Sequence, residues 1–130
     1  MYQAVTRNIA VTVSPRFRPE RSSSEEGRYF WAYTIEIRNR GDTTVQLKTR
    51  RWIITDGTGQ KQEVRGAGVV GEEPVLEPGA AFEYTSGVPL PTPSGFMVGT
   101  YGMVTLDGER FDIEIPAFSL DSPHARRTIN

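Results

Sequence analysis

The segment from Tyr29 to Asn39 constrains the fold more than any other part of this sequence. Its large apolar residues fall on every second position, and most positions between them are small or polar. A period of two is typical of a β-strand with one buried and one solvated face. Such strands belong to antiparallel sheets that cover a core on one side. The residues predicted to face the core are Tyr29, Trp31, Tyr33, Ile35 and Ile37.

Short alternating or apolar segments recur along the rest of the chain, with turn residues between them. Asp56-Gly57 and Asp107-Gly108 are typical hairpin turns, and no segment has an apolar stripe at helical spacing. The sequence therefore predicts an all-β protein, an antiparallel β-sandwich of about seven or eight strands. The other predicted strands are residues 9–13, 44–55, 60–65, 75–76, 81–86, 96–105 and 111–115.

Prolines and side-chain parity give more detailed expectations. Pro15 should end the first strand, which leaves residues 14–28 as a long polar loop, and Pro116 should end the last strand. Residues 89–93 hold three prolines and are expected to form a connector outside the sheets. In the strand at 44–55, Val45 and Leu47 should share one face, and Trp52 should lie on the other.

The length of 130 residues suits a single domain, residues 1–130, with a core from about 5 to 120 and a loose tail at 121–130. Cysteine is absent, which rules out disulfides and thiol chemistry. No segment approaches the roughly 20 apolar residues of a membrane helix, and the first residues lack a secretory h-region. We therefore expect a cytoplasmic protein that is not itself a membrane transporter, and the sequence indicates no cofactor.

Gly66, Gly68 and Gly71 spell G-x-G-x-x-G, the outline of a phosphate-binding loop. A dinucleotide site needs this motif between a strand and a helix, but Pro78-Gly79 would end any helix after about one turn. Glu72-Glu73 would also repel an anion. We expect a shaped β-connection, in which glycines allow bends and close backbone approach. The alternative is a nest of backbone N–H groups that binds a small anion or a nucleotide such as ATP or a diadenosine polyphosphate.

Catalytic and metal-binding residues are not predicted. Acidic residues cluster at 72–77 and 107–114, but without the ligand spacing of a metal site. His124 is the only histidine and lies in the predicted tail, and Thr85-Ser86-Gly87 is not a G-x-S-x-G nucleophile elbow. We therefore expect a protein that is not an enzyme. A phosphohydrolase activity stays open, but no nucleophile and base can be named for it.

Nucleic-acid binding is not favoured by the charge of the chain. Basic residues do lie beside aromatic ones, a combination that suits backbone contact and base stacking. The net charge of −1 argues against this function. The residues concerned are Arg16, Phe17, Arg18, Arg21, Arg50, Arg51 and Trp52.

Protein–protein contact is the function that the residues favour most. A sandwich has sheet edges that can accept an extended peptide. Phe30 is an aromatic residue on the expected outer face of its strand, and Val69-Val70 are apolar residues held out between the three glycines. We predict that Phe30, Val69 and Val70 contact a protein partner, and a homodimer is left open.

Six blocks of the sequence stand in a specific order: RYFWAYTIEIRN at 28–39, RRWIITDGTG at 50–59, EVRGAGVVGEEPVLEPG at 63–79, FEYTSG at 82–87, GFMVGTYGM at 95–103 and FDIEIPAF at 111–118. In this combination and order, they resemble the ApaG family. The likeness runs from about residue 5 to residue 120. Glu73 stands where that family usually has glutamine, which weakens the anion-binding alternative further.

This resemblance implies a fibronectin-III or immunoglobulin-like sandwich without an assigned reaction. It also implies an indirect role in cobalt resistance and magnesium efflux, since the expected fold has no membrane span. Related domains in eukaryotic adaptor proteins, including F-box proteins, look like interaction modules. In bacteria the gene commonly neighbours a diadenosine tetraphosphate hydrolase, which is only an association. The expectation is a binding or accessory module in divalent-cation homeostasis.

Overall fold

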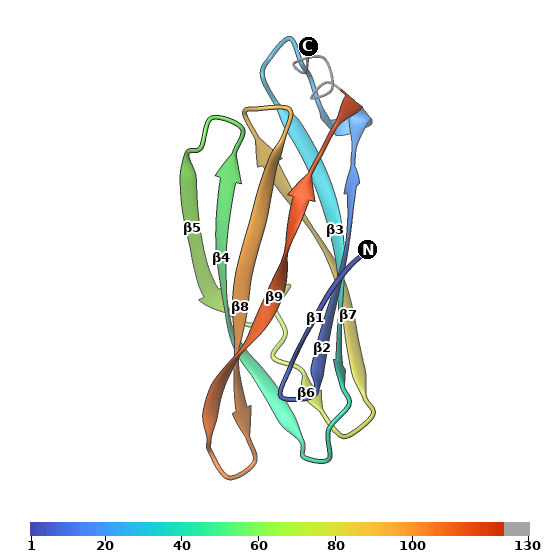
Figure 1. Ribbon diagram of the computed structural model, residues 1–130, viewed down its shortest axis with the longest axis vertical. Coiled ribbons are helices and arrows are strands. Elements are labelled where there is room, and N and C mark those ends of the chain that lie inside the picture. The colour runs from blue at the N-terminus through green and yellow to red at the C-terminus, as the bar shows by residue number, and fades with distance from the viewer. Residues whose placement is uncertain (124–130) are drawn as a thin grey trace.

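The computed structural model describes residues 1–123 and consists mostly of antiparallel strands (Figure 1). Within these residues the helical structure is one turn of 3-10 helix, η1 (Pro19–Arg21). The predicted all-β class is confirmed. The strands are β1 (Tyr2–Thr6), β2 (Ile9–Phe17), β3 (Tyr29–Asn39), β4 (Val45–Asp56), β5 (Lys61–Ala67), β6 (Val75–Leu76), β7 (Ala81–Leu90), β8 (Gly95–Thr105) and β9 (Arg110–Leu120).

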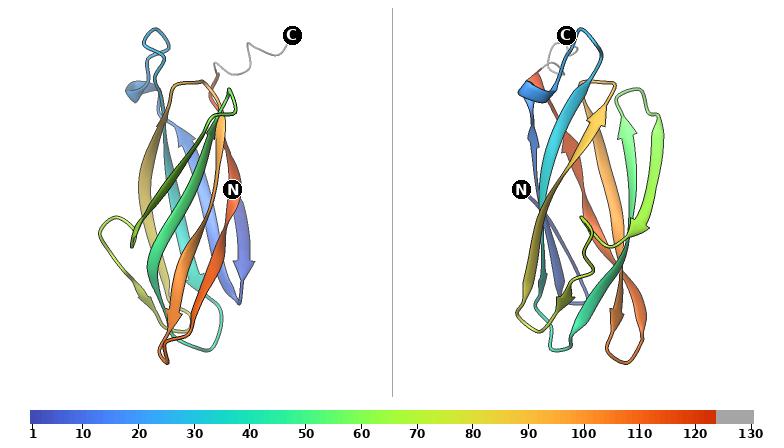
Figure 2. Two further views of the ribbon diagram at one scale, coloured as in Figure 1. Left: turned by 90° about the vertical axis from the view of Figure 1, so that its left-hand side faces the viewer. Right: turned by 180° about the vertical axis from the view of Figure 1, so that it is seen from behind.

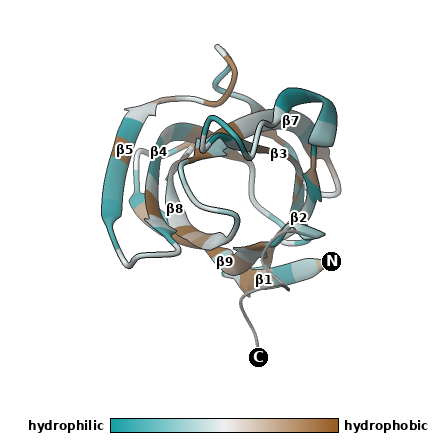
Figure 3. Cartoon of the chain, turned by 90° about the horizontal axis from the view of Figure 1, so that it is seen from above, coloured by the Kyte–Doolittle hydropathy of each residue, from teal (hydrophilic) through white to brown (hydrophobic). Residues whose placement is uncertain are grey.

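The strands form two sheets that enclose one core. The first sheet has the order β1-β2-β3-β7, and the second has the order β5-β4-β8-β9, with short β6 pairing with β4. All strand pairs in residues 1–123 are antiparallel. Seen from above, the two sheets face each other across a common interior (Figure 3). This is the predicted sandwich.

The core is filled from both sheets by aromatic and aliphatic side chains. All five β3 residues predicted to face inward are buried. Trp31, Tyr101 and Phe118 are among the largest fully buried side chains. The rings of Tyr33, Trp52 and Phe118 contact one another, with centroid distances of 5.5 Å, 5.8 Å and 5.9 Å. Such aromatic contacts link β3 of the first sheet to β4 and β9 of the second.

The two long sides of the sandwich are built differently. On one side, which we call the closed side, β9 lies against β1 and β2 (Figure 3). On the other, which we call the open side, β7 and β5 are edge strands that no ladder joins. The segment at residues 68–74 leaves β5 and crosses between the sheets on the open side (Figure 2).

Prolines do not end the strands where the sequence predicted. Pro15 lies inside β2, because β1 pairs only as far as Val13 and β2 has a single neighbour beyond that point. Pro89 lies inside β7, which is an edge strand and tolerates a residue without an N–H. Pro116 lies at a register shift between β8 and β9, and β9 continues through it to Leu120.

A β-bulge in β4 overturns the predicted faces of that strand. The pairing with β8 shifts its register between Leu47 and Thr49. The extra residue reverses the alternation, so Trp52 faces the core together with Val45 and Leu47. Arg50 has the same parity as Trp52 and therefore points inward as well. The prediction of opposite faces for Val45 and Trp52 was wrong for this reason.

The packed structure extends two residues beyond the predicted core boundary at 120. The indole Nε1 of Trp31 donates to the carbonyl oxygen of Asp121 at 2.8 Å. Ser122 is buried, and its hydroxyl donates to the carbonyl oxygen of Pro93 at 2.7 Å. Residues 124–130 of the predicted tail, including His124, lie outside the described residues.

Candidate functional site

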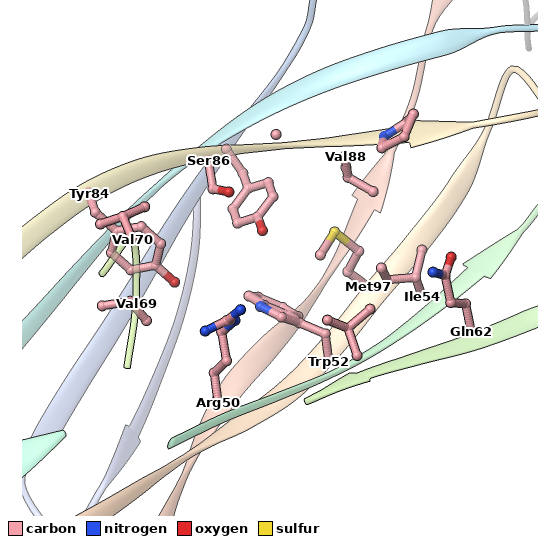
Figure 4. A pocket seen from close by; sticks show the side chains of 14 residues that line it. Arg50, Trp52, Ile54, Gln62, Val69, Val70, Tyr84, Ser86, Val88 and Met97 are labelled. Carbon is pink, nitrogen blue, oxygen red and sulfur yellow. The ribbon is translucent and has the colours of Figure 1, made fainter. Parts of the chain in front are cut away.

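A cleft of about 370 Å³ opens between the two sheets on the open side. Its long walls come from β4 and β5 of the second sheet and from β7 of the first, and the segment at 68–74 closes one end (Figure 4). It combines apolar side chains with one arginine and several hydroxyl groups. The lining residues are Tyr33, Arg50, Trp52, Ile54, Gln62, Val64, Val69, Val70, Tyr84, Ser86, Gly87, Val88, Pro89 and Met97.

Three cross-strand pairs make the wall that belongs to the second sheet. The register of β4 and β5 places Arg50 opposite Gly66, Trp52 opposite Val64, and Ile54 opposite Gln62. Directly opposite residues lie side by side on one face of a sheet. The β4 members face the cleft because of the bulge between Leu47 and Thr49. Without that bulge, Arg50 would point to the outer surface.

Arg50 is held in place by the backbone beside it. Its Nη1 donates to the carbonyl oxygens of Ala67 at 3.0 Å and Gly68 at 2.8 Å. The guanidinium also lies flat over Gly66, since a Cβ at that position would come within 2.7 Å of Arg50 Cζ. The close-up view shows the guanidinium directed into the cleft between Trp52 and Tyr84 (Figure 4).

The opposite wall presents hydroxyl groups to the same space. Tyr84 and Ser86 project inward from β7, and Ser86 pairs with Tyr33 of β3. The hydroxyls of Tyr84 and Tyr101 share a short hydrogen bond. Burial raises the pKa of Tyr84 and of Tyr101 well above the ordinary value of 10.0, and the positive charge of Arg50 opposes part of that rise. The tyrosines are therefore neutral donors and acceptors at neutral pH.

The segment at 68–74 turns back on itself through a tight hairpin. The N–H of Val69 donates to the carbonyl oxygen of Glu72, and the N–H of Glu72 donates to that of Val69, both at 2.8 Å. Val70 and Gly71, the two central residues, have φ angles of +43° and +81°. Positive φ at both positions is the pattern of a type I′ turn. Val70 is a β-branched residue in a left-handed conformation, which is uncommon and costs energy.

Each glycine of the G-x-G-x-x-G motif has its own structural reason. Gly66 makes room for the Arg50 guanidinium. Gly68 has a φ of +62°, and a Cβ there would lie 2.3 Å from the carbonyl oxygen of Glu72. Gly71 has a φ of +81° in open space, so only its turn conformation requires glycine. The expected shaped β-connection is what the structure shows, and no helix follows the motif within the described residues.

The nucleotide-binding alternative for this loop stays a prediction. Three of the backbone N–H groups are already bound within the chain, because Gly68 donates to the carbonyl oxygen of Lys48 at 2.9 Å, and Val69 and Glu72 donate to each other. Glu73 forms an ion pair with Lys48 at 2.7 Å. These contacts fasten the loop to β4 and leave fewer donors for an anion.

Of the three residues predicted to contact a partner, Val69 and Val70 both line the cleft, whereas Phe30 does not. Val69 is 1% exposed and belongs to the core, so the expectation that both valines are held out is wrong for Val69, while Val70 is 56% exposed. The Phe30 ring lies on the other face of the first sheet, packed over Gly87 and beneath the Arg21 guanidinium, whose Cζ lies 4.1 Å from the ring centroid. Partner contact stays a prediction for Phe30 and Val70.

Other predicted candidates are spread over the molecule. Arg18 pairs with Glu20 at η1, and Arg51 pairs with Glu63 on the outer face of the second sheet. Across residues 1–123, no group of three or more His, Cys, Asp or Glu side chains is arranged to hold a metal ion. None of the helical structure in the same residues is long and apolar enough to cross a membrane.

Comparison with known proteins decides the family. The sequence model of the ApaG domain matches residues 19–105, a range that contains every residue of the cleft. The chain belongs to the ApaG domain family. It is 65% identical to Protein ApaG of Bradyrhizobium diazoefficiens and 67% identical to Protein ApaG of Afipia carboxidovorans, in both cases over 100% of each chain. The crystal structure of an ApaA protein from Bordetella pertussis superimposes with a TM-score of 0.86 at 50% identity, over 88% of this chain and 94% of that one.

The ApaG domain therefore places in its cleft a set of residues that the sequence did not assign to a site. The sequence groups Arg50 and Trp52 with the candidates for nucleic-acid binding, considers Ser86 only as a nucleophile and rejects it, and assigns no role to Tyr84. Their convergence depends on the bulge at Leu47–Thr49 and on the pairing of β7 with β3. The one visible signal is the Arg-Arg-Trp run at residues 50–52, in which a strand places Arg50 and Trp52 on one face and Arg51 on the other.

Proposed function

We propose that this ApaG-domain protein is a non-enzymatic binding module that captures an extended peptide segment of a protein partner on its open side. The observation that carries the proposal is the cleft itself, an elongated groove between two edge strands. The part of β7 that lines it runs from Tyr84 to Pro89, which spans roughly 16 Å at about 3.3 Å per residue. A groove of this length suits about five residues of an extended peptide.

The edge of β7 is the better docking strand of the two. Natural edge strands are usually protected from further pairing by charged residues. The solvent-facing side chains of β5 are charged at Lys61, Glu63 and Arg65, whereas Glu83 is the only charged residue in β7. A peptide that adds to β7 gains main-chain hydrogen bonds, and alternate side chains enter the cleft. Val70, exposed at the end of the cleft, supplies an apolar rim.

The experiment is a selection from a displayed library of random nine-residue peptides, followed by amide hydrogen exchange with the selected peptide. We expect slower exchange for amides between Tyr84 and Val88, because strand addition covers the free edge of β7. Amides of β1 and β9 on the closed side should not change. Failure to select any peptide, or protection of the closed side alone, would contradict the proposal.

A matched pair of peptides separates strand addition from simple side-chain contact. Methylation of alternate backbone nitrogens in the selected peptide removes N–H donors without changing the side chains. If the peptide adds to β7, one methylation pattern should abolish binding and the pattern shifted by one residue should be tolerated. Equal binding by both would show that the peptide does not pair with the strand.

The connection with divalent cations is an indirect one in this proposal. The family resemblance links ApaG domains to cobalt resistance and magnesium efflux, and we place this chain in the cytoplasm as an accessory to such a process. The chain contributes to that process by capturing a protein partner. Deletion of the gene should then change cobalt tolerance, and variants that lose peptide capture should fail to restore it. Restoration by those variants would separate the cation phenotype from the cleft.

A further inference from the structure

The Arg50 side chain carries hydrogen-bonding capacity that the protein itself does not use. A guanidinium has five N–H donors, and the two hydrogens of Arg50 Nη1 go to the carbonyl oxygens of Ala67 and Gly68. Nε and Nη2 have no acceptor among residues 1–123, and no carboxylate in that part of the chain pairs with Arg50. The nearby Arg51, by contrast, pairs with Glu63.

The chemistry around Arg50 is that of an anion site with an apolar extension. No Asp or Glu is among the residues that line the cleft, so the arginine charge is not neutralised there. Tyr84 and Ser86 add hydroxyl groups nearby, and Trp52, Val88 and Met97 supply apolar surface (Figure 4). A half-buried cation gains most from an anion that replaces its lost water.

The position of the guanidinium is set before any ligand arrives. Two backbone carbonyls and the flat contact with Gly66 hold it. A preorganised donor loses little conformational entropy on binding, so more of the interaction energy appears as affinity. The unused Nε and Nη2 hydrogens form the planar fork that matches the two oxygens of a carboxylate.

We infer that the cleft recognises a carboxylate at Arg50, and that the captured peptide carries an acidic residue two positions away from an apolar one. This inference rests on the proposed function. Alternate residues of a strand point to the same side and lie roughly 6.6 Å apart. Arg50 and Trp52 have that spacing along β4. An acidic side chain on the peptide meets Arg50, and the apolar side chain two positions along packs between Trp52 and Val88.

The test uses the selected peptide with its acidic residue changed from Glu to Gln or from Asp to Asn, together with two protein variants. Arg50→Gln removes the cleft cation, and Arg51→Gln is the matched control on the outer face of the same strand. We expect the neutral peptide and the Arg50→Gln variant each to weaken binding by about 10- to 100-fold, the range for hydrogen bonds to charged groups. Combining the two changes should add little more. Arg51→Gln should leave the affinity unchanged.

A second pair of probes tests the carboxylate site without any peptide. At millimolar concentration, 3-phenylpropanoate should shift the NMR signals of the Arg50 Nε–H and the Trp52 indole, whereas uncharged 3-phenylpropanamide should not. Arg50→Lys keeps the charge but loses the fork, and we expect an intermediate affinity. Thermal unfolding of each variant checks that it is folded.

The outcomes separate the two proposals. A peptide that protects β7 but binds equally well as its neutral form would overturn the carboxylate inference and leave the binding module standing. Shifts at Arg50 with 3-phenylpropanoate, but no selected peptide, would overturn peptide capture and retain the anion site. No response to either probe, or equal losses for Arg50→Gln and Arg51→Gln, would overturn the carboxylate inference.

Discussion

The closed and open sides of this sandwich differ in how the chain covers the sheet edge that lies there. Each side contains a sheet edge, and an edge that is left exposed offers unpaired backbone groups to other chains. On the closed side, β1 covers the edge of β9, where the Thr6 hydroxyl accepts the Glu114 N–H at 3.1 Å and the Tyr2 hydroxyl accepts the Ser119 N–H at 3.3 Å. On the open side, β7 faces a cleft. One edge is satisfied within the chain, and the other is the edge at which we propose that a peptide binds.

Phe118 offers the strongest test that stability is concentrated toward the closed side. Its ring lies in β9, fully buried, and contacts Tyr2, Tyr33 and Trp52. We expect Phe118→Ala to lower the free energy of unfolding by about 3–5 kcal/mol, because it leaves a cavity where both sheets meet. Urea denaturation measures the loss.

The matched control for that measurement is Phe96→Ala. Phe96 lies in β8 and is 44% exposed, so we expect a loss under about 1 kcal/mol. If both variants lost similar stability, the aromatic cluster beside β9 would not be the main link between the sheets.

Gly68→Ala should have the next largest effect, at the loop that closes one end of the cleft. Alanine there must adopt a φ of +62°, and its Cβ would meet the carbonyl oxygen of Glu72 at 2.3 Å. We expect a loss of at least about 2 kcal/mol from strain and displaced backbone. Gly71→Ala has a positive φ but open space, so it should cost only about 1 kcal/mol. Thermal unfolding ranks the two variants, and the reverse ranking would show that the hairpin can shift.

The sequence predicted the sandwich because the rule behind a half-buried strand is local. The alternation in β3 requires no knowledge of its neighbours, and all five of its inward residues are buried. The cleft was not predictable in this way. Whether Arg50 faces inward depends on one extra residue between Leu47 and Thr49, and the pairing with β8, which no pattern within β4 encodes, fixes that bulge.

The glycine motif shows the same limit from another direction. Its glycines indicate an unusual backbone conformation, and the sequence correctly favoured a shaped connection without a helix. The separate reasons for Gly66 and Gly68 depend on neighbours distant in the chain or across a turn, namely the Arg50 guanidinium and the Glu72 carbonyl. Val69 was misplaced because the turn that buries it and exposes Val70 follows from hydrogen bonds, not from hydropathy.

Because of Tyr84, the free energy of unfolding should depend on pH in the alkaline range. Burial raises its pKa above the ordinary value of 10.0, so the folded protein keeps a proton that the unfolded chain releases above pH 10. The stabilisation is complete below that pH and declines as the pH rises toward the folded-state pKa. Each such tyrosine should reduce stability by up to about 1.4 kcal/mol per pH unit.

Tyr84→Phe is the variant that checks this dependence. Urea denaturation at a series of pH values from neutral to above 10 should give a shallower decline than in the unaltered protein, because Tyr101 remains as the buried partner. Tyr29→Phe, which removes a tyrosine hydroxyl from β3, is the control variant for the same series of denaturation measurements. Identical slopes for Tyr84→Phe and the unaltered protein would mean that the Tyr84 hydroxyl ionises normally in the folded state.

Thr6→Val should have the smallest effect, and it addresses the difference between the two sides directly. Valine keeps the shape of threonine but cannot accept the Glu114 N–H, so we expect a loss of about 1 kcal/mol in the free energy of unfolding. Thr12→Val, on the neighbouring strand, removes only an exposed contact with Gln3 and should change stability by less than about 0.5 kcal/mol. Amide exchange at Glu114 should also become faster in Thr6→Val. If it did not, packing alone would hold β1 against β9. The edge of β9 would then be shielded from a partner without any side-chain acceptor.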